Sequence, residues 1–553
     1  MSTPTAAGGS TATQWPAAAE NLRWWDREVG YEVYIRSFAD GNGDGVGDFV
    51  GLTDKLDYLA WLGIGIVWIT PFYPSPMADF GYDVADYTDV DPLFGTLADF
   101  DACVAEAHRL GLRVLVDLVP NHTSDQHRWF QSSRSDPDGY WRGYYHWRDP
   151  GPGGGPPNNW VSHFGGPAWT LDEASGQYYL HLFLPEQPDL NWSNPRLVRE
   201  FDQILEFWLD RHVDGFRVDV AHGLVKNMLM PDNPQRFPVT PDMSPRQAWA
   251  CYDHRYDLDQ AGVTAIYRRW RNIVEPRDAL LLGEVYLREN NPDRVSRYVT
   301  HQDGLHRAFY FAPMHTPWEP AALWSTFRDA LDAAPRDLSW ALSSHDDPRA
   351  PTRLGGGALG RARALSYAVL QFALPGLPFL YQGEELALDD VDVPPQQCQD
   401  PVAVRNQNPA DGRDGCRTPM PWAPGPTGGF TDADEPWLPV GRAPADTVAA
   451  QRDDPGSALA KYRELLALRR ELTDLHHAEL EWLTDRPAPV ISFRRGDCVC
   501  ALNVADDPKE LALPPGRWRV AFSSQREAGP VVEGELTLEA PEGLLLVAEP
   551  GEA

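Results

Sequence analysis

Hydrophobic and polar positions along the chain follow two alternating patterns. Short apolar and β-branched runs, which favour strands, occur at 31–38, 64–70, 113–119, 215–220, 279–285, 307–312, 338–344 and 376–383. Segments with apolar residues at helical spacing lie between them, for example at 52–62, 97–110, 195–212 and 361–374. Eight strands that alternate with helices predict an α/β protein with a closed parallel (β/α)8 barrel of the TIM type rather than an open sheet.

Two stretches interrupt the alternation. About 70 residues rich in Gly, Pro, Trp and Tyr separate the third strand from the next helix. A loop of that length without structure is uncommon, so we expect a small inserted domain over the barrel mouth. A Pro- and Gly-rich span, 387–456, precedes a last helix, and short strand patterns follow it. The predicted parts are a disordered tail at 1–20, the barrel at 21–121 and 190–475, the inserted domain at 122–189, and a C-terminal all-β sandwich domain at 476–553.

Four of the predicted strands end in polar groups. The run 215–222 places Arg217 and Asp219 inside an apolar strand, where either charge alone would be costly to bury. A structural salt bridge is the simpler interpretation of one such pair. Three further strand ends repeat the pattern, and the carboxyl ends of barrel strands share one face. We therefore expect one acidic site built from Asp117, His122, Arg217, Asp219, Glu284, His345 and Asp346.

Composition excludes some classes of function. The formal net charge is -32 at pH 7, and the sequence offers no clustered basic surface that could bind nucleic acid. The sequence contains no apolar run long enough to span a membrane, and its first 20 residues lack the features of a signal peptide. Six scattered cysteines favour free thiols in a reducing compartment, which predicts the cytoplasm. Whether Cys398 and Cys416 pair stays open, and so does the oligomeric state.

The segment 40–48, DGNGDGVGD, places oxygen-bearing side chains on alternate residues. This resembles the first half of a calcium-binding loop. An EF-hand is excluded because position twelve is Gly51 and no helix precedes the loop. A site for a hard cation is favoured over a plain loop of Asx turns.

Four segments resemble the signature regions of the α-amylase family of glycoside hydrolases, family 13. They are 117–122 (DLVPNH), 215–219 (GFRVD), 283–285 (GEV) and 345–346 (HD). The segments 81–87 (GYDVADY), 381–385 (YQGEE) and 413–422 (RDGCRTPMPW) strengthen the match. The segment 187–191 (QPDLN) resembles the signature of the oligo-1,6-glucosidase and α-glucosidase branch. The similarity covers most of the span from 31 to 422.

The resemblance implies catalytic roles that the chemistry of these residues also favours. Asp219 would be the nucleophile, with Arg217 beside it to keep the carboxylate ionised. Glu284 would be the general acid and later the base, which requires a raised pKa. Asp346 would accept hydrogen bonds from sugar hydroxyls and stabilise a cationic transition state.

The resemblance also implies ligand contacts. Asp79 and Tyr82 would hold the non-reducing glucose, which predicts exo action. Val220 follows the nucleophile; among relatives valine there accompanies α-1,6 links and threonine α-1,4 links, but the neighbouring run resembles neither group, so the linkage stays open. The implied substrate contacts are Asp79, Tyr82, His122, Arg217, Val220, His345 and Arg413. The implied ligands of a structural Ca²⁺ or Mg²⁺ are the side chains of Asp40, Asn42, Asp44 and Asp48 and the carbonyl of Val46, with no organic cofactor.

The sequence thus predicts a retaining exo-acting α-glucosidase whose partner is a small oligosaccharide such as maltose. A trehalose synthase, a sucrose isomerase or another transglucosylase would use the same nucleophile and differ only in the acceptor, which sequence does not reveal. A non-catalytic amylase-like partner of a membrane transporter would have lost the carboxylates, and all three are present here.

Overall fold

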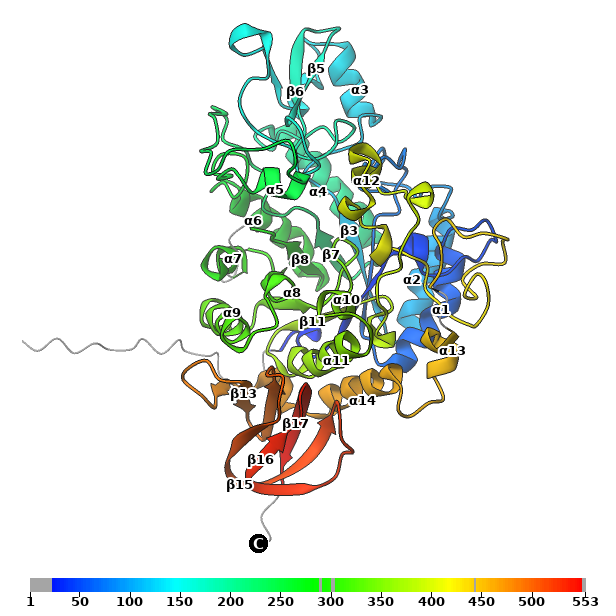
Figure 1. Cartoon of the computed structure of the whole chain (residues 1–553). Coiled ribbons are helices and arrows are strands. Elements are labelled where there is room, and N and C mark those ends of the chain that lie inside the picture. Colours follow the sequence, from blue (N-terminus) through cyan, green and yellow to red (C-terminus); the bar gives the residue numbers. More distant parts are fainter. Residues whose placement is uncertain (1–21, 288–290, 300–303, 442–443, 550–553) are drawn as a thin grey trace, which may run out of the picture.

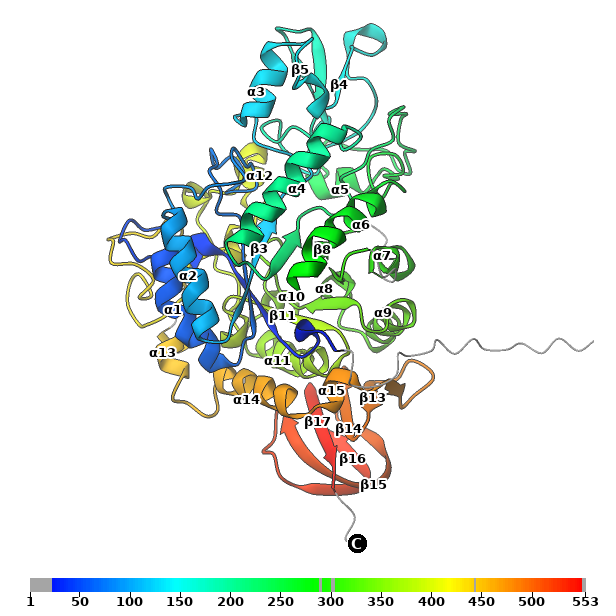
Figure 2. The same cartoon turned by 180° about the vertical axis from the view of Figure 1, so that it is seen from behind.

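The computed structural model describes residues 22–549 except 288–290, 300–303 and 442–443. The tail predicted at 1–20 lies outside the described residues. Figures 1 and 2 show a barrel in the middle, an inserted segment beyond one of its ends and an antiparallel sheet beyond the other.

The predicted barrel is confirmed. Eight strands close into a barrel in the order β1-β11-β10-β9-β8-β7-β3-β2, and all neighbours with a described register run parallel. Every predicted strand coincides with one of them. The strands are β1 (Gly30–Val33), β2 (Ile66–Ile69), β3 (Arg113–Leu118), β7 (Gly215–Val218), β8 (Leu280–Glu284), β9 (Arg307–Phe309), β10 (Leu338–Ala341) and β11 (Leu377–Tyr381).

A main helix follows each barrel strand and covers the outside of the barrel. The predicted helices coincide with α1, α2, α4 and α11 to within a few residues. Figure 1 shows this outer layer, with α11 and α14 next to the C-terminal sheet. The helices are α1 (Phe49–Leu62), α2 (Leu97–Arg109), α4 (Pro195–Asp210), α6 (Val263–Val274), α7 (Pro292–Val299), α9 (Pro320–Ala333), α11 (Gly357–Ala373) and α14 (Ala458–Glu471).

Local capping explains where these helices begin. Asp48 caps α1 by accepting a hydrogen bond from the Gly51 amide at 2.7 Å. Thr96 and Asp99 form a capping box at the start of α2, in which each side chain bonds the backbone of the other. Asn194 caps α4, and a proline at its first position needs no hydrogen-bond acceptor there. These caps fix the ends of helices that flank the strands of the site.

The segment inserted after β3 forms a small unit of its own. Strands β4, β6 and β5 pair antiparallel in that order, and helix α3 packs beside them. A bridge between His122 and Asp189 joins the outgoing and returning chain. The predicted inserted domain is confirmed, whereas its limits at 122 and 189 stay predictions. The elements are α3 (Arg128–Ser135), β4 (Trp147–Arg148), β5 (Trp169–Asp172) and β6 (Gln177–Leu180).

The C-terminal region is all-β, as predicted, and its six strands belong to one sheet in the order β12-β13-β14-β17-β15-β16. One face packs on the barrel through side chains such as Phe493 and Leu545. The other face carries a separate hydrophobic cluster that includes Val499 and Trp518. The strands are β12 (Leu480–Trp482), β13 (Val490–Arg495), β14 (Cys498–Asn503), β15 (Lys509–Ser523), β16 (Val531–Leu538) and β17 (Glu542–Ala548).

Short helices lie in the connections between these elements. Within the described ranges, no helix combines the length and the apolar character that a membrane span requires. The short helices are α5 (Pro245–Trp249), α8 (Ala312–His315), α10 (Ala350–Arg353), α12 (Pro401–Asn406), α13 (Val448–Gln451) and α15 (Asp474–His477).

Candidate active site

The acidic centre lies where β3, β7 and β8 end. Strand register places Asp117 opposite Arg217, and Val218 opposite Gly283. Asp219 directly follows Val218, and Glu284 directly follows Gly283. Their side chains therefore leave neighbouring strands at the same height in the barrel. Both belong to the end of the barrel where TIM-barrel enzymes carry their chemistry.

One guanidinium joins the carboxylates of this centre. Nη1 of Arg217 donates to Oδ1 of Asp219 at 2.6 Å and to both oxygens of Asp117 at 3.1 Å. Its Nη2 donates to Oε2 of Glu284 at 2.9 Å. Arg217 is 2% exposed and Asp117 is fully buried. Asp219 and Glu284 are therefore held close together by one guanidinium.

The cluster contains more negative than positive groups. Three carboxylates surround one guanidinium. Burial raises the pKa of Asp117 to about 6, although Arg217 opposes the change. Burial also raises the pKa of Asp219; Arg217 lowers it, while Glu284 and Asp117 raise it again. Arg217 therefore does not by itself keep Asp219 ionised, because burial and the two neighbouring carboxylates act against it.

Val220 carries a strained backbone directly after Asp219. Its φ is +44°, which is unusual for a β-branched residue. In this conformation its amide donates to Oε2 of Glu284 at 3.0 Å. The strain thus aims a backbone donor at the second carboxylate, and strain of this kind is concentrated at functional sites.

A second cluster holds Asp346. Arg413 donates from Nη1 to Asp346 at 3.0 Å, from Nη2 to Asp79 at 2.8 Å and from Nε to Asp400 at 2.6 Å. Arg417 adds a bond to Asp346 at 2.9 Å. Burial opposes ionisation of Asp346, but His345, Arg413 and Arg417 outweigh it and hold the pKa of Asp346 well below its usual range. Asp346 is therefore an anion at neutral pH.

His345 and His122 are fixed in the walls of the site. His345 lies between the rings of Tyr34 and Tyr82, nearly parallel to both. Its Nε2 is 2.9 Å from the Tyr82 hydroxyl, and its Nδ1 contacts the carboxylate of Glu32. Burial lowers the pKa of His122 to about 4, so this ring is neutral.

All ten residues predicted to be catalytic or to contact substrate line one cavity of about 660 Å³. Asp219 and Glu284 lie in it together with Asp346, and aromatic side chains such as Phe183 and Trp249 form part of its wall. Two neighbouring carboxylates, a third anion and an aromatic wall suit a glycosidic substrate. The cavity can thus perform glycoside chemistry.

Comparisons with known proteins agree with this geometry. Residues 32–478 match the model of the alpha amylase catalytic domain. The chain belongs to the α-amylase family of glycoside hydrolases.

Among relatives in this family, a probable alpha-glucosidase of Rhizobium meliloti is 41% identical over 89% of this chain and 92% of that protein. An oligo-1,6-glucosidase of Heyndrickxia coagulans is 34% identical over 92% of this chain and 96% of that protein. The chain is thus a glycoside hydrolase with glucosidase relatives, not the non-catalytic partner protein considered from sequence.

Solved structures of the same family are also similar. The alpha-glucosyl transfer enzyme XgtA superposes with a TM-score of 0.87 at 39% identity, over 96% of this chain and all of that one (100%). The trehalulose synthase MutB from Pseudomonas mesoacidophila MX-45 superposes with a TM-score of 0.84 at 32% identity, over 96% of this chain and 100% of that one. Hydrolysis and glucosyl transfer therefore both occur on this scaffold.

The loop predicted to bind a cation, 40–48, is not part of the cavity lining of this α-amylase-family enzyme. Asp40, Asn42 and Asp44 each accept a hydrogen bond from the amide two residues ahead, at 2.9–3.1 Å. Asp48 accepts from the amides of Gly41, Asn42 and Gly51. Within the described ranges, no three His, Cys, Asp or Glu side chains gather as a metal site would require. The bonds are those of Asx turns, and they leave oxygen lone pairs of Asn42 and Asp44 unused, whereas Asp40 also accepts from the amides of Gly43 and Gly45 and from the hydroxyl of Thr431.

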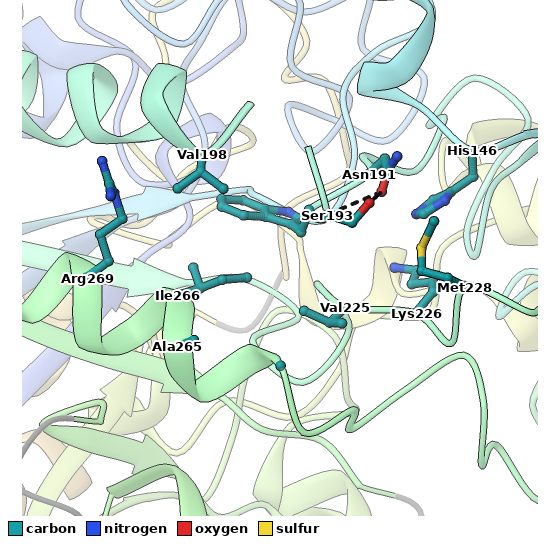
Figure 3. A pocket seen from close by; sticks show the side chains of 12 residues that line it. His146, Asn191, Ser193, Val198, Val225, Lys226, Met228, Ala265, Ile266 and Arg269 are labelled. Atoms are coloured by element: carbon teal, nitrogen blue, oxygen red, sulfur yellow. Dashed lines mark hydrogen bonds between the residues drawn. The ribbon is translucent and has the colours of Figure 1, made fainter. Parts of the chain in front are cut away.

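A second pocket of about 330 Å³ lies outside the barrel, between α4 and α6 (Figure 3). Figure 3 shows Arg269 at one end of it and His146 with Lys226 at the other. None of its lining residues, all in the described part of the chain, is a carboxylate. It therefore lacks the acid groups that glycoside chemistry needs.

Sequence analysis missed four polar residues of the site or assigned them no role. Asp117, Arg417 and Asp400 complete the two charge clusters, and Glu32 contacts His345. Glu32 could have been predicted from the sequence, because a charged residue inside the apolar strand 31–38 is as unusual as Arg217 inside its own strand. Asp400 lies in a long loop whose path no periodic pattern indicates.

Proposed function

We propose that the enzyme is a retaining, exo-acting α-glucosidase. It releases glucose from the non-reducing end of short α-glucosides, such as maltose and small malto- or isomalto-oligosaccharides, by double displacement. The observation that carries this proposal is the guanidinium of Arg217, which is shared by Asp219 and Glu284 inside one cavity. A guanidinium bonded to both carboxylates supports a short separation between them, and retaining enzymes depend on one of roughly 5–5.5 Å.

In the first step, a carboxylate oxygen of Asp219 attacks the anomeric carbon while Glu284 gives its proton to the glycosidic oxygen. The carbon–oxygen bond to the leaving group breaks as the bond to Asp219 forms. This assignment makes Glu284 the acid and Asp219 the attacking anion. Two features support it: Asp219 makes the shorter bond to Arg217, and the Glu284 side chain is 16% exposed to the cavity against 7% for Asp219.

In the second step, Glu284 removes a proton from water, and the resulting hydroxide oxygen displaces Asp219 from the anomeric carbon. Two inversions return the product to the α configuration. Positive charge develops on the sugar ring in both steps. The anionic Asp346, ionised by its neighbours Arg413 and Arg417, stabilises that charge.

Exo action is supported by the cluster around Arg413. Its bond to Asp79, together with the bond that Gln187 donates to Asp79 at 3.2 Å, ties the inserted segment to the loop after the last barrel strand. Asp79, Gln187 and Arg413 all line the cavity next to Asp346. In this proposal they block it beyond the terminal glucose, so that an internal sugar of a longer chain does not fit.

The second candidate function is glucosyl transfer to a sugar acceptor. It is favoured by the structural similarity to a glucosyl transfer enzyme and to a trehalulose synthase. Neither the preference between α-1,4 and α-1,6 links nor the acceptor follows from Val220. Incubation with maltose, isomaltose, sucrose and trehalose separates the candidates. We expect free glucose, released first as the α anomer in proton NMR; accumulation of a new disaccharide instead would favour transfer.

We also propose that the loop 40–48 binds Ca²⁺ or Mg²⁺ for stability. The side chains of Asp40, Asn42 and Asp44 and the carbonyl of Val46 would supply oxygen ligands, which hard cations prefer. Asp48 would have to share the oxygens that now cap α1. The cytoplasmic location stays a prediction as well. It is supported by the six cysteines, including Cys398 and Cys416, which are all free thiols.

A further inference from the structure

Glu32 is a buried carboxylate in the floor of the cavity. It lies on β1, where strand register places it between Trp68 of β2 and Tyr381 of β11. Its side chain is 4% exposed, and it lines the cavity with the predicted catalytic residues. In the described part of the chain, no Lys or Arg forms a salt bridge with Glu32; its ionic contact is with Nδ1 of His345. A buried carboxylate with an imidazole partner is costly to keep without a role.

The position of the His345 ring does not depend on Glu32. The ring is stacked between Tyr34, at 5.7 Å and 13°, and Tyr82, at 5.4 Å and 9°. Both tyrosines are buried. Both stacked contacts hold the plane of the imidazole. What Glu32 adds is control of which ring nitrogen carries a proton.

An ionised carboxylate can only accept hydrogen bonds, so Nδ1 of His345 must carry the hydrogen toward Glu32. Nε2, on the opposite side of the ring, then faces the Tyr82 hydroxyl at 2.9 Å and Oδ2 of Asp346 at 3.4 Å. In the neutral ring Nε2 accepts the Tyr82 proton. In the cationic ring Nε2 donates toward Asp346. A reversed tautomer, with hydrogen on Nε2 and a bare Nδ1, is incompatible with the carboxylate.

We propose that Glu32 is a positioning residue of the glucosidase reaction, which acts by fixing the proton of His345 on Nδ1. Through His345 it sets the direction of the hydrogen bonds that Tyr82 and Asp346 present to the sugar. This inference rests on the proposed function, because Tyr82, His345 and Asp346 are its predicted sugar contacts. Partners of this kind, which orient a histidine from behind, typically contribute on the order of 10- to 100-fold to activity.

The test uses Glu32→Gln, which keeps the size of the side chain but presents an amide N–H₂ that can donate to Nδ1. Glu385→Gln is the matched control. Glu385 is also a fully buried glutamate at a barrel strand end, and the hydroxyls of Tyr31 and Tyr58 donate to it at 2.9 Å and 2.7 Å. It does not line the cavity. We expect Glu32→Gln to lower kcat by about 10- to 100-fold with KM changed less than about 3-fold, and Glu385→Gln to leave both within about 2-fold.

A double-mutant cycle shows whether Glu32 acts through His345. In a His345→Gln background, Glu32→Gln should lower kcat by less than about 2-fold, since the group it controls is gone. Losses that multiply in the double variant would overturn the proposal. Full activity of Glu32→Gln, or an equal loss in Glu385→Gln, would overturn it too.

Nitrogen-15 NMR of histidine-labelled protein gives a readout independent of turnover. The His345 signals are those that disappear in His345→Gln. In the wild type Nδ1 should carry the proton, and in Glu32→Gln the proton should move to Nε2; the same tautomer in both proteins would contradict the proposal. If the wild-type enzyme hydrolyses no α-glucoside, the proposed function fails, while this spectrum still decides the role of Glu32.

Discussion

Both ends of the barrel bury arginine side chains, but their partners differ. At the carboxyl end, Arg217 and Arg413 each bond three carboxylates. At the amino end, Arg469 donates to the carbonyls of residues just before β11, and Arg495 donates to three carbonyls that include Ala373 at 3.0 Å and Leu475 at 2.7 Å. Among the described residues, neither Arg469 nor Arg495 forms a salt bridge with a carboxylate.

The difference shows in the protonation equilibria. Burial lowers the pKa of Arg469 to about 10 and lowers that of Arg495 as well, with further lowering by Arg469. Burial also disfavours the charge of Arg217, but Asp117 and Glu284 outweigh it and raise the pKa of Arg217. A buried arginine thus marks an active site only where carboxylates and a cavity accompany it. Where backbone carbonyls surround it, the arginine joins two parts of the fold, here the barrel and the C-terminal sheet.

The largest expected effect comes from neutralising a carboxylate at the catalytic end. Asp219→Asn removes the proposed nucleophile but keeps its shape, so kcat should fall by at least roughly 10⁴-fold. The melting temperature should stay the same or rise, because the change relieves repulsion among three carboxylates. Steady-state kinetics and thermal unfolding of the same preparation measure both. Wild-type turnover in this variant would contradict the assignment of the chemistry to the carboxylates at the carboxyl end.

The opposite pattern is expected at the amino end. Arg495→Met removes a guanidinium that satisfies buried carbonyls of α11 and α15, so unfolding should cost about 2–5 kcal/mol less. Activity below the melting temperature should stay within about 2-fold of the wild type, because the site lies at the other end of the barrel. The matched control is Arg494→Met, on the same strand but with a side chain that is 38% exposed. A strong loss of kcat in Arg495→Met, with the fold intact, would show that the two ends are coupled.

The residues at the two ends of the barrel could be predicted from the sequence to different extents. The barrel strands and the ten cavity residues follow from alternation, from charges inside apolar runs and from family motifs, all of which are local signals. The bond of Arg413 to Asp79 joins segments far apart in the chain, so no local pattern indicates it. The order of the C-terminal strands could not be predicted for a similar reason. Strand patterns indicate where strands lie, but β14 pairs with β17 rather than with the strand that follows it in the chain.

Acidification should affect the inserted segment at the catalytic end. Burial lowers the pKa of His127 to about 3 and that of His181 to about 4, from 6.5 in an unfolded chain. Below pH 6.5 the unfolded chain therefore binds protons that the folded chain does not. Each histidine should then reduce the free energy of unfolding by roughly 1.4 kcal/mol per pH unit as pH falls toward its folded-state pKa, and contribute no slope above neutrality.

Urea unfolding across this pH range measures the slope. His181→Gln should make it shallower by roughly 1.4 kcal/mol per pH unit. His212→Gln is the control, because His212 is exposed and its replacement should leave the slope unchanged. An unchanged slope in His181→Gln would mean that this ring is already charged in the folded protein.

The smallest expected effect concerns the loop 40–48. Excess Ca²⁺ should raise the melting temperature by a few degrees, which EDTA reverses, because a ligand that binds only the folded state stabilises it by mass action. Asp44→Ala should abolish this response, whereas Asp57→Ala, at an exposed position of α1, should retain it. A melting temperature that neither calcium nor EDTA changes in the wild type would show that the loop is only a series of turns.

The nucleophilic role of Asp219 is tested most directly by trapping the covalent intermediate. A fluorinated α-glucosyl fluoride forms the glucosyl-enzyme quickly and releases it slowly, so the sugar stays attached to its nucleophile. Peptide mass spectrometry should then find one added fluoroglucosyl group, on the carboxylate of Asp219. Attachment to Glu284 or to a residue outside the cavity, or inactivation without any attached sugar, would contradict the account.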